Sequence, residues 1–360
     1  MSARHGGNAG GNFVIRVDLQ RRINGSAECA RNRPSGRGLR QLASGRSILV
    51  RIPPVNSDFV RSEVPAEVGE RFPDVAALAT ALDTTGYLAG DQLAAALFLA
   101  VRMGQPILLE GEPGVGKTQA AKSLAEALDT TLIRLQCYEG ISAAEALYEW
   151  NYPKQLLAIR LAEATRETLR ETDLFRPEFL LTRPLLAALD HPGPRPAVLL
   201  IDEVDRADDE FEAFLFELLA ESSVTIPELG TRHAVVPPVV VLTSNRTRDL
   251  HDALKRRCLY HWIGFPDARR VAEIIRRRVP AASGALAGEV AVAVARLREL
   301  GLTKAPGISE AITWAGALTV FGTQALSADA AERTMSVVVK YPEDEQTVRE
   351  AGLASLVRHD

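Results

Sequence analysis

The stretch GEPGVGKT, from Gly111 to Thr118, combines the residue types that bind a phosphate group. Its three glycines let the backbone turn tightly, so that successive N–H groups point at one anion. Lys117 supplies a positive charge for the β and γ phosphates of a nucleotide, and Thr118 supplies a hydroxyl for Mg²⁺. A glycine turn followed by a chance Lys-Thr pair is the alternative. The remaining predicted contacts to the nucleotide come from Gly111, Glu112, Pro113, Gly114, Val115, Gly116 and Gln119.

The second group that could do chemistry is a pair of adjacent carboxylates, Asp202 and Glu203, at the end of the apolar run VLLIDE. Neighbouring residues of a strand point in opposite directions, so the two carboxylates are expected to have different roles. Asp202 is predicted to hold Mg²⁺ together with Thr118, and Glu203 to polarise the attacking water. A helix-capping Asp-Glu pair is the alternative.

Asn245 also ends a buried apolar run, VVVLTSN, and is followed by Lys255, Arg256 and Arg257. If its strand belongs to the same sheet, the Asn245 amide lies at the same edge and orients the attacking water or the γ phosphate. An arginine about ten residues later is predicted to reach a nucleotide in a neighbouring subunit. A turn-forming Asn and a solvated basic turn are the alternatives. Both Arg256 and Arg257 remain candidates.

The elements around these residues alternate between strands and helices. The phosphate-binding stretch lies between a short apolar strand, Ile107 to Leu109, and a segment of strong helix formers, TQAAKSLAEALDT. A helix that begins there adds its positive end to the site. This alternation predicts a parallel sheet wrapped by helices, with ligands at the carboxyl edge of its strands. After Pro266 the strand signals fade and four helical segments follow, which predicts a small all-α lid domain.

These patterns divide the chain into four parts. We expect an arginine- and glycine-rich segment over residues 1–62, either disordered or an over-extended start of the reading frame. An α/β nucleotide-binding domain over 63–266, a helical lid over 267–345 and a tail over 346–360 are predicted to follow.

Charge is distributed unevenly. Residues 1–55 carry a formal charge of +8, so the rest of the chain carries −12 to give the total of −4. The acidic body argues against a grip on a nucleic-acid backbone, although an arginine-rich arm is compatible with nucleic-acid binding or with a transit peptide.

The cysteines and histidines predict no further chemistry. Cys29, Cys137 and Cys258 form no CxxC pair, and the histidines show no metal-ligand spacing. We therefore expect a protein of the reducing cytoplasm, and the sequence contains no apolar run long enough to span a membrane.

Taken together, the motifs resemble those of AAA+ ATPases, and more narrowly those of the MoxR family and its CoxD-like subgroup. GEPGVGKT is similar to Walker A, VLLIDEVDRA to Walker B, VLTSNR to sensor 1, and LKRRC to the arginine-finger segment, with Arg257 at the usual arginine. The resemblance implies a P-loop NTPase fold with a helical lid. It also implies ATP and Mg²⁺ as cofactors and a ring, commonly a hexamer. It further implies a von Willebrand factor A domain protein as partner and a metalloenzyme client, such as a molybdenum hydroxylase like carbon monoxide dehydrogenase.

Two features stand beside this resemblance. Lys117 and Asp202 are 85 positions apart, which leaves room for a helix-2 insertion near residues 138–156. This insertion contains Tyr138, Tyr148, Trp150 and Tyr152. These aromatic residues either grip a polypeptide or pack the insertion itself. In the lid, Glu310 occupies the position where many relatives have a sensor 2 arginine, and an acid there cannot assist a phosphate.

Three functions are compatible with these observations. The first is an ATP-hydrolysing remodelling protein, the second is a binding scaffold whose conformation is set by ATP, and the third is a motor on DNA. Steady turnover at saturating ATP distinguishes the first from the second. Salt-sensitive DNA binding is required for the third.

Overall fold

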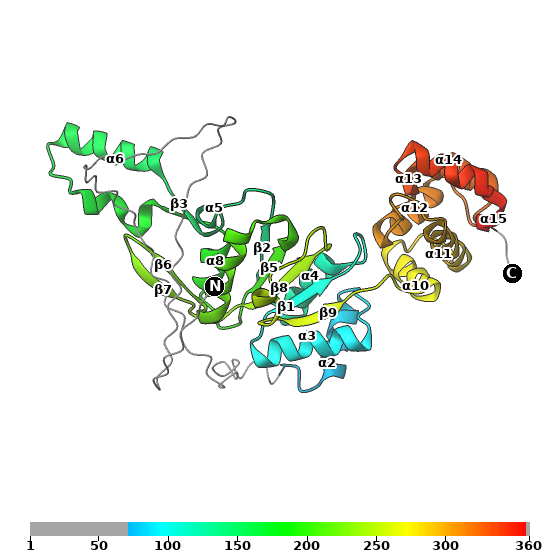
Figure 1. Ribbon diagram of the computed structural model, residues 1–360, viewed down its shortest axis with the longest axis horizontal. Helices are drawn as coiled ribbons and strands as arrows, with labels where there is room; N and C mark the ends of the chain where they lie inside the picture. Colours follow the sequence, from blue (N-terminus) through cyan, green and yellow to red (C-terminus); the bar gives the residue numbers. More distant parts are fainter. Residues whose placement is uncertain (1–70, 358–360) are drawn as a thin grey trace, which may run out of the picture. The chain divides into compact units, whose positions relative to one another are not determined.

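The computed structural model describes residues 71–357, except for the side chain of Glu217. Five parallel strands form its central sheet in the order β2-β5-β8-β1-β9 (Figure 1). The strands are β1 (Ile107–Glu110), β2 (Leu132–Gln136), β5 (Val198–Asp202), β8 (Val239–Ser244) and β9 (Leu259–Trp262). This order confirms the predicted parallel sheet. Because β8 lies between β1 and β5, their carboxyl ends meet at one edge.

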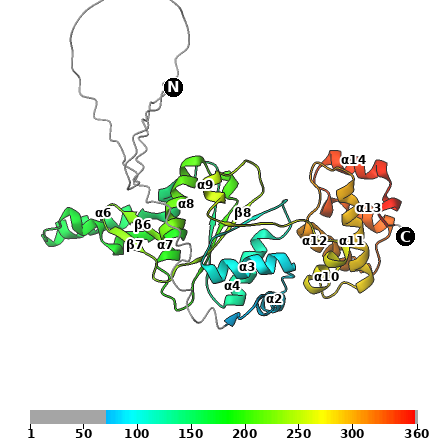
Figure 2. The ribbon, with the colours of Figure 1, turned by 60° about the horizontal axis from the view of Figure 1, so that its bottom comes forward.

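Helices cover both faces of the sheet (Figure 2). One face packs against α2 (Val75–Thr84), α3 (Asp91–Met103) and α4 (Lys117–Leu128). The other packs against α5 (Ala143–Leu147), α7 (Pro184–Leu189), α8 (Asp209–Glu221) and α9 (Asp252–Lys255). β5 and β8 are buried along their whole length, which explains why both are apolar runs instead of alternating strands.

Local signals account for the helix that supports the carboxylates. Asp208 caps α8 by accepting a hydrogen bond from the Phe211 N–H at 2.9 Å. Acidic residues fill the first turn, where they interact favourably with the helix dipole. The short 3-10 helix η3 (Val204–Arg206) connects β5 to α8. The antiparallel hairpin of β6 (Ser223–Ile226) and β7 (Gly230–His233) follows α8.

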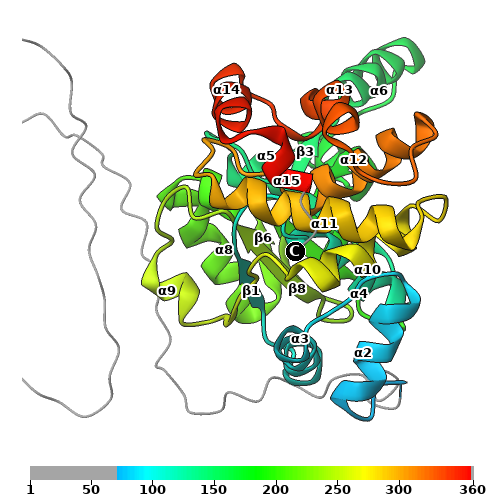
Figure 3. The same cartoon turned by 90° about the vertical axis from the view of Figure 1, so that its right-hand side faces the viewer.

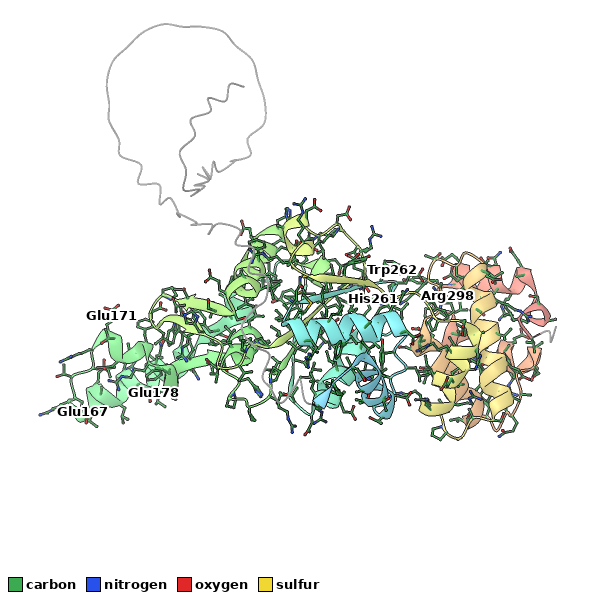
Figure 4. All side chains as sticks on the ribbon, turned by 90° about the horizontal axis from the view of Figure 1, so that it is seen from below. Glu167, Glu171, Glu178, His261, Trp262 and Arg298 are labelled. Carbon is green, nitrogen blue, oxygen red and sulfur yellow. The ribbon has the colours of Figure 1, made fainter. Side chains whose placement is uncertain are left out.

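The insertion is longer than the sequence indicates. β3 (Tyr148–Trp150) leads into α6 (Tyr152–Thr165), and the 3-10 turns η1 (Glu171–Phe175) and η2 (Pro177–Phe179) return the chain to β4 (Leu180–Thr182). β3 and β4 pair antiparallel. The insertion therefore continues well past residue 156, because the strand that returns the chain to the domain is β4. Figure 4 labels Glu167, Glu171 and Glu178 in this part of the chain.

The C-terminal region is helical throughout its described length (Figure 3). It comprises α10 (Ala268–Arg278), α11 (Gly284–Glu299), α12 (Ile308–Val320), α13 (Ala328–Val338), α14 (Pro342–Ala351) and α15 (Leu353–Val357). Residues 346–357 are thus not a tail. Val348 and Leu356 are buried in the same core as Trp314, and burying them requires α14 and α15 to pack on the lid. Asp344 also anchors α14 by accepting hydrogen bonds from two backbone N–H groups.

Other predictions concern parts of the chain that are not described. The arginine-rich segment of residues 1–62 and Cys29 lie outside the described residues. Within residues 71–357, no helix is both long and apolar enough to cross a bilayer.

Candidate nucleotide site

The phosphate-binding loop follows β1 and ends where α4 begins at Lys117. Gly116 has a φ of 96°, a left-handed conformation that favours glycine. A Cβ on Gly111 would lie 2.3 Å from the Ile263 carbonyl oxygen, so no larger residue fits there. Inside the loop, the Lys117 ammonium donates hydrogen bonds to the carbonyl oxygens of Gly111 (2.7 Å) and Glu112 (2.9 Å).

Lys117 is held in a buried, negatively charged environment. Desolvation lowers its pKa, and the neighbouring carboxylates, foremost Asp205, oppose this shift. The Lys117 ammonium therefore lies between loop carbonyl oxygens and acids. A bound phosphate would offset the cost of keeping this charge out of water. Gln119, at the second position after Lys117, donates to the Ser123 hydroxyl and lines the adjoining cavity.

Thr118 and Asp202 form an oxygen pair suited to Mg²⁺. The Thr118 hydroxyl donates to Asp202 Oδ1 at 3.0 Å, and the Thr243 hydroxyl donates to the same atom at 2.5 Å. Mg²⁺ prefers hard oxygen ligands and usually binds through one or two protein groups together with phosphate oxygens. This donor set, at the start of α4 and beside the phosphate loop, fits the ion.

Glu203 leaves the strand in a left-handed conformation, with φ of 57°. Its backbone N–H donates to the Thr243 hydroxyl at 3.0 Å, which ties the residue to β8. Its carboxylate accepts a hydrogen bond from the Gln136 amide at 3.0 Å and forms an ion pair with Arg206 Nε at 3.0 Å. Sequence reasoning missed both partners. The available signal for Gln136 was its position at the end of a strand that pairs with β5.

Asp202 has a further partner that the sequence did not indicate. Arg134 of β2 donates from Nε (3.0 Å) and Nη2 (2.6 Å) to Asp202 Oδ2. The same Nη2 also donates to Oε1, the side-chain amide oxygen of Gln136. Arg134 is about half exposed, at 46%, whereas the Asp202 side chain is only 4% exposed.

Asn245 lies at the edge where it was expected. Its backbone N–H donates to Asp205 Oδ2 at 3.2 Å, and that oxygen also accepts from the N–H (2.8 Å) and hydroxyl (2.6 Å) of Thr247. Within the part of the chain that is described, the Asn245 side-chain amide makes no hydrogen bond and Asp205 Oδ1 is buried without a partner. Asp205 therefore positions the Asn245 loop, a role that sequence reasoning missed.

The two candidate arginines differ in their surroundings. Arg257 stacks on the Phe216 ring at 3.6 Å, and desolvation lowers its pKa. Arg256 is exposed. Among residues 71–357, no hydrogen bond or ion pair joins either arginine to Lys117, Asp202 or Glu203. The structure thus brings together the loop, the carboxylates and Asn245 but leaves both arginines apart from them.

A buried acid joins the strand ends on the other side of the loop. Glu110 of β1 accepts hydrogen bonds from the Ser244 hydroxyl (3.1 Å) and the Tyr260 hydroxyl (3.1 Å). Arg246 lies 3.8 Å from the same carboxylate and also faces the Trp262 ring. These contacts connect β1, β8 and β9 directly before the phosphate loop.

A cavity of about 540 Å³ opens beside the loop. Loop glycines Gly114 and Gly116, the β9 residues His261 and Trp262 and the lid residue Ile308 contribute to its lining. Its size and apolar walls suit a nucleoside next to the phosphate loop. Figure 4 shows His261 and Trp262 on β9, together with Arg298 of the lid helix α11.

The lid touches the loop through the start of α12. The Ile308 N–H donates to the Gly114 carbonyl oxygen at 3.0 Å, and Arg298 forms an ion pair with Glu112 while stacking on Phe265 at 4.0 Å. Glu310 accepts the Gly307 N–H at 3.0 Å and caps its own helix. The lid arginine that reaches the loop is therefore Arg298, which sequence reasoning missed.

Comparisons with known proteins give a family match over part of the chain and matches to solved structures. Residues 106–258 match the family described as AAA domain (dynein-related subfamily). The structure is similar to the RuvB Holliday junction branch migration motor of Thermotoga maritima (19% identity, 78% of this chain and 73% of that chain, TM-score 0.37). It is also similar to a candidate ATPase of Cytophaga hutchinsonii (15% identity, 82% and 95%, TM-score 0.40). A search of curated proteins finds no significant match.

Proposed function

We propose that this chain, which carries an AAA domain, hydrolyses ATP with Mg²⁺ and uses the energy to remodel a client protein. The observation that carries the hydrolysis is the convergence of Thr118, Asp202 and Glu203 at one sheet edge, directly beside the phosphate loop. A loop alone binds a nucleotide. A metal-holding pair with a second carboxylate next to it also provides the means to cleave one.

Each side chain has a separate task in this proposal. Lys117 exchanges its loop carbonyl contacts for the β and γ phosphates, and Thr118 and Asp202 hold Mg²⁺. When bound, the ion neutralises charge that develops on the phosphate oxygens. Glu203 accepts a proton from the attacking water, and Asn245 orients that water. ADP and phosphate are the products.

The hydrolysis is tested with two variants of the site. Glu203→Gln should bind ATP with an affinity within a few-fold of the parent and hydrolyse it about a hundredfold more slowly or worse, because the base is lost. Lys117→Ala should lose most of the nucleotide affinity. Binding is measured with a fluorescent ATP analogue and turnover by phosphate release. Parent-rate turnover by Glu203→Gln would remove Glu203 from its role.

One feature of the site favours a second candidate, a scaffold switched by ATP without steady turnover. Gln136 and Arg206 both contact the Glu203 carboxylate through the same oxygen, Oε2, and together they fix its orientation in this conformation. Steady phosphate release by the purified parent at saturating ATP excludes the scaffold. A single burst that stops after one turnover supports it.

The remodelling part rests on the insertion and on the resemblance to the MoxR family. Tyr152 is 65% exposed at the start of α6, and Leu156, Leu157 and Leu161 are exposed on the same helix. Broad apolar and aromatic surface of this kind suits contact with a polypeptide. The client proposed first is a metalloenzyme of the molybdenum hydroxylase class. A von Willebrand factor A domain protein and a hexameric ring of this chain are the proposed assembly.

The insertion separates a working surface from a packing core. Trp150 is 7% exposed and meets the Phe175 ring edge-on, with 5.2 Å between ring centroids. Tyr152→Ala should therefore keep ATP hydrolysis within about threefold of the parent and abolish client activation, because an exposed aromatic anchor is lost. Trp150→Ala should instead lower the melting temperature, since it opens a cavity.

Two measurements on each variant distinguish a residue of the working surface from a packing residue. One is the ATPase rate of the purified protein, and the other is client activity in cells that carry only the variant. Full client activity with Tyr152→Ala would remove this part of α6 from the working surface.

A further inference from the structure

Arg298, in the last turn of α11, contacts three separate parts of the chain. Its Nη1 donates to the Pro306 carbonyl oxygen at 2.9 Å, and its Nη2 forms an ion pair with the Glu112 carboxylate. The guanidinium also lies over the Phe265 ring, 4.0 Å from the ring centroid. No step of the proposed reaction uses a residue of the lid, so the reaction does not explain these contacts.

The three partners of Arg298 lie where the lid meets the α/β region. Phe265 is in the connection between β9 and α10, and it packs against the hydrophobic cores of both parts. Pro306 directly precedes Gly307, the N-cap residue of α12. Glu112 is the second residue of the phosphate loop. One guanidinium therefore ties the connection and the segment before α12 to the phosphate loop.

The lid holds the phosphate loop at two points. Arg298 holds the Glu112 side chain, and the Ile308 N–H donates to the Gly114 carbonyl oxygen at 3.0 Å. Because Arg298 also binds the Pro306 carbonyl, two residues before Ile308, the same guanidinium helps to position the second point.

The first of these points leads to the phosphate-binding lysine. The Glu112 carbonyl oxygen accepts a hydrogen bond from the Lys117 ammonium at 2.9 Å. If Glu112 moved with the lid, an acceptor of this ammonium would move as well. The position of the lid is thus linked to the lysine that is assigned to the β and γ phosphates.

We propose that Arg298 is a positioning residue for the phosphate loop, and that by holding the lid on the loop through Glu112 it slows the release of the nucleotide. This inference rests on the proposed function, because it concerns the same nucleotide site. A planar guanidinium can bind a carboxylate and a carbonyl oxygen at the same time. The Arg298 side chain is only 15% exposed, whereas that of Glu112 is 55% exposed. The contact is therefore shielded from water on the lid side and can open on the loop side.

A second ion pair between the lid and the α/β region provides a matched control. Arg277 of α10 contacts Asp83 of α2 at 2.6 Å and also pairs with Glu273 of its own helix. Within residues 71–357, the Arg277 side chain forms no hydrogen bond or ion pair with the phosphate loop. A general effect of lid attachment would appear in variants of both arginines, whereas an effect through the loop would appear only in variants of Arg298.

The test measures how fast a fluorescent ADP analogue leaves the purified full-length protein after excess unlabelled ADP is added. Arg298→Met keeps an apolar stem on Phe265 and removes both polar contacts. It should release the analogue about tenfold faster, because a hydrogen bond to a charged group contributes roughly this factor. Glu112→Ala should have a similar effect. Arg277→Met should stay within about twofold of the parent, since an exposed ion pair contributes little.

A double variant tests whether Arg298 acts through Glu112. Arg298→Met made in the Glu112→Ala background should raise the release rate by no more than about twofold, because the partner is already absent. An arginine that only packs the lid would give its full effect in both backgrounds. Additive effects would therefore overturn the inference.

The remaining outcomes separate this inference from the proposed function. A parent protein that binds neither ADP nor ATP would contradict the proposed function itself. A parent that binds ADP, beside Glu112→Ala with an unchanged release rate, would overturn only the inference. An effect of Arg277→Met as large as that of Arg298→Met would overturn it as well. Because the Glu112 side chain is exposed, Glu112→Ala remains a valid test even if Arg298→Met lowers the melting temperature.

Discussion

Asp205 lies three residues after Asp202, in the turn η3, and its side chain is buried. One carboxylate oxygen accepts three hydrogen bonds from Asn245 and Thr247. The same carboxylate contributes most among the acids to the electrostatic environment of Lys117. A single acid thus connects the phosphate-binding lysine with the loop that presents Asn245.

Asp205→Asn keeps the shape of the side chain and removes its charge. We expect kcat for ATP hydrolysis to fall about tenfold, because charge-assisted hydrogen bonds that position Asn245 are weakened. KM for ATP should stay within a few-fold. The control is Asp209→Asn, an exposed acid at the start of α8 whose side chain is 74% exposed. An unchanged kcat in Asp205→Asn would show that Asn245 is held by other contacts.

At the scale of elements, the start of α12 rests on the phosphate loop. A Cβ added to Gly307 would lie 2.9 Å from the Gly114 Cα and 3.1 Å from its carbonyl oxygen. Both are backbone atoms, so the loop or the helix would have to move. The absence of a side chain at Gly307 is what allows the Ile308 N–H to reach the Gly114 carbonyl.

Gly307→Ala should therefore weaken nucleotide binding by about tenfold, because the lid helix is pushed away from the loop that binds the phosphates. Gly316→Ala is the matched control on the same helix. Its Cβ would meet nothing within 4 Å, and replacing glycine inside a helix should raise the melting temperature. Nucleotide affinity and melting temperature are measured for both. Equal affinities in the two variants would contradict a direct role of the α12–loop contact.

At the scale of the whole molecule, neither candidate arginine forms a hydrogen bond or ion pair with Lys117, Asp202 or Glu203 of its own chain within residues 71–357. Arg257 follows α9 and stacks on Phe216 of its own chain, and this contact fixes the direction of its side chain. A rigidly held guanidinium away from its own site suits a nucleotide in the next subunit of a ring. We therefore propose that Arg257 completes a site to which two chains contribute.

Mixing inactive chains tests this sharing. Arg257→Ala alone should lose about a thousandfold in kcat, the scale of an arginine that stabilises phosphoryl transfer. Mixed with Lys117→Ala chains, it should regain part of the activity, because some interfaces then contain one intact site. Arg256→Ala is the matched control and should stay active by itself. An inactive Arg256→Ala beside an active Arg257→Ala would move the role by one residue.

The sequence by itself determined the sheet, the phosphate loop and the strand ends with Asp202, Glu203 and Asn245. Each of these features is recognised from residues close together in the sequence. The loop is three glycines and Lys-Thr within eight residues, and the strands are apolar runs that end in a polar side chain. Because parallel strands share one carboxyl edge, even their meeting point was predictable. The roles of these residues in hydrolysis stay predictions.

Only the tertiary structure decided which side chains surround those residues. Arg134 and Gln136 lie 68 and 67 positions from their acids, and Arg298 lies 186 positions from Glu112. No local pattern marks such partners, because strand order and helix packing bring them together. The same holds for Trp150, whose burial depends on Phe175, and for the last helices, whose apolar residues needed a lid core to pack against. Motifs made of adjacent residues can be recognised in the sequence, whereas these contacts depend on which distant elements become neighbours.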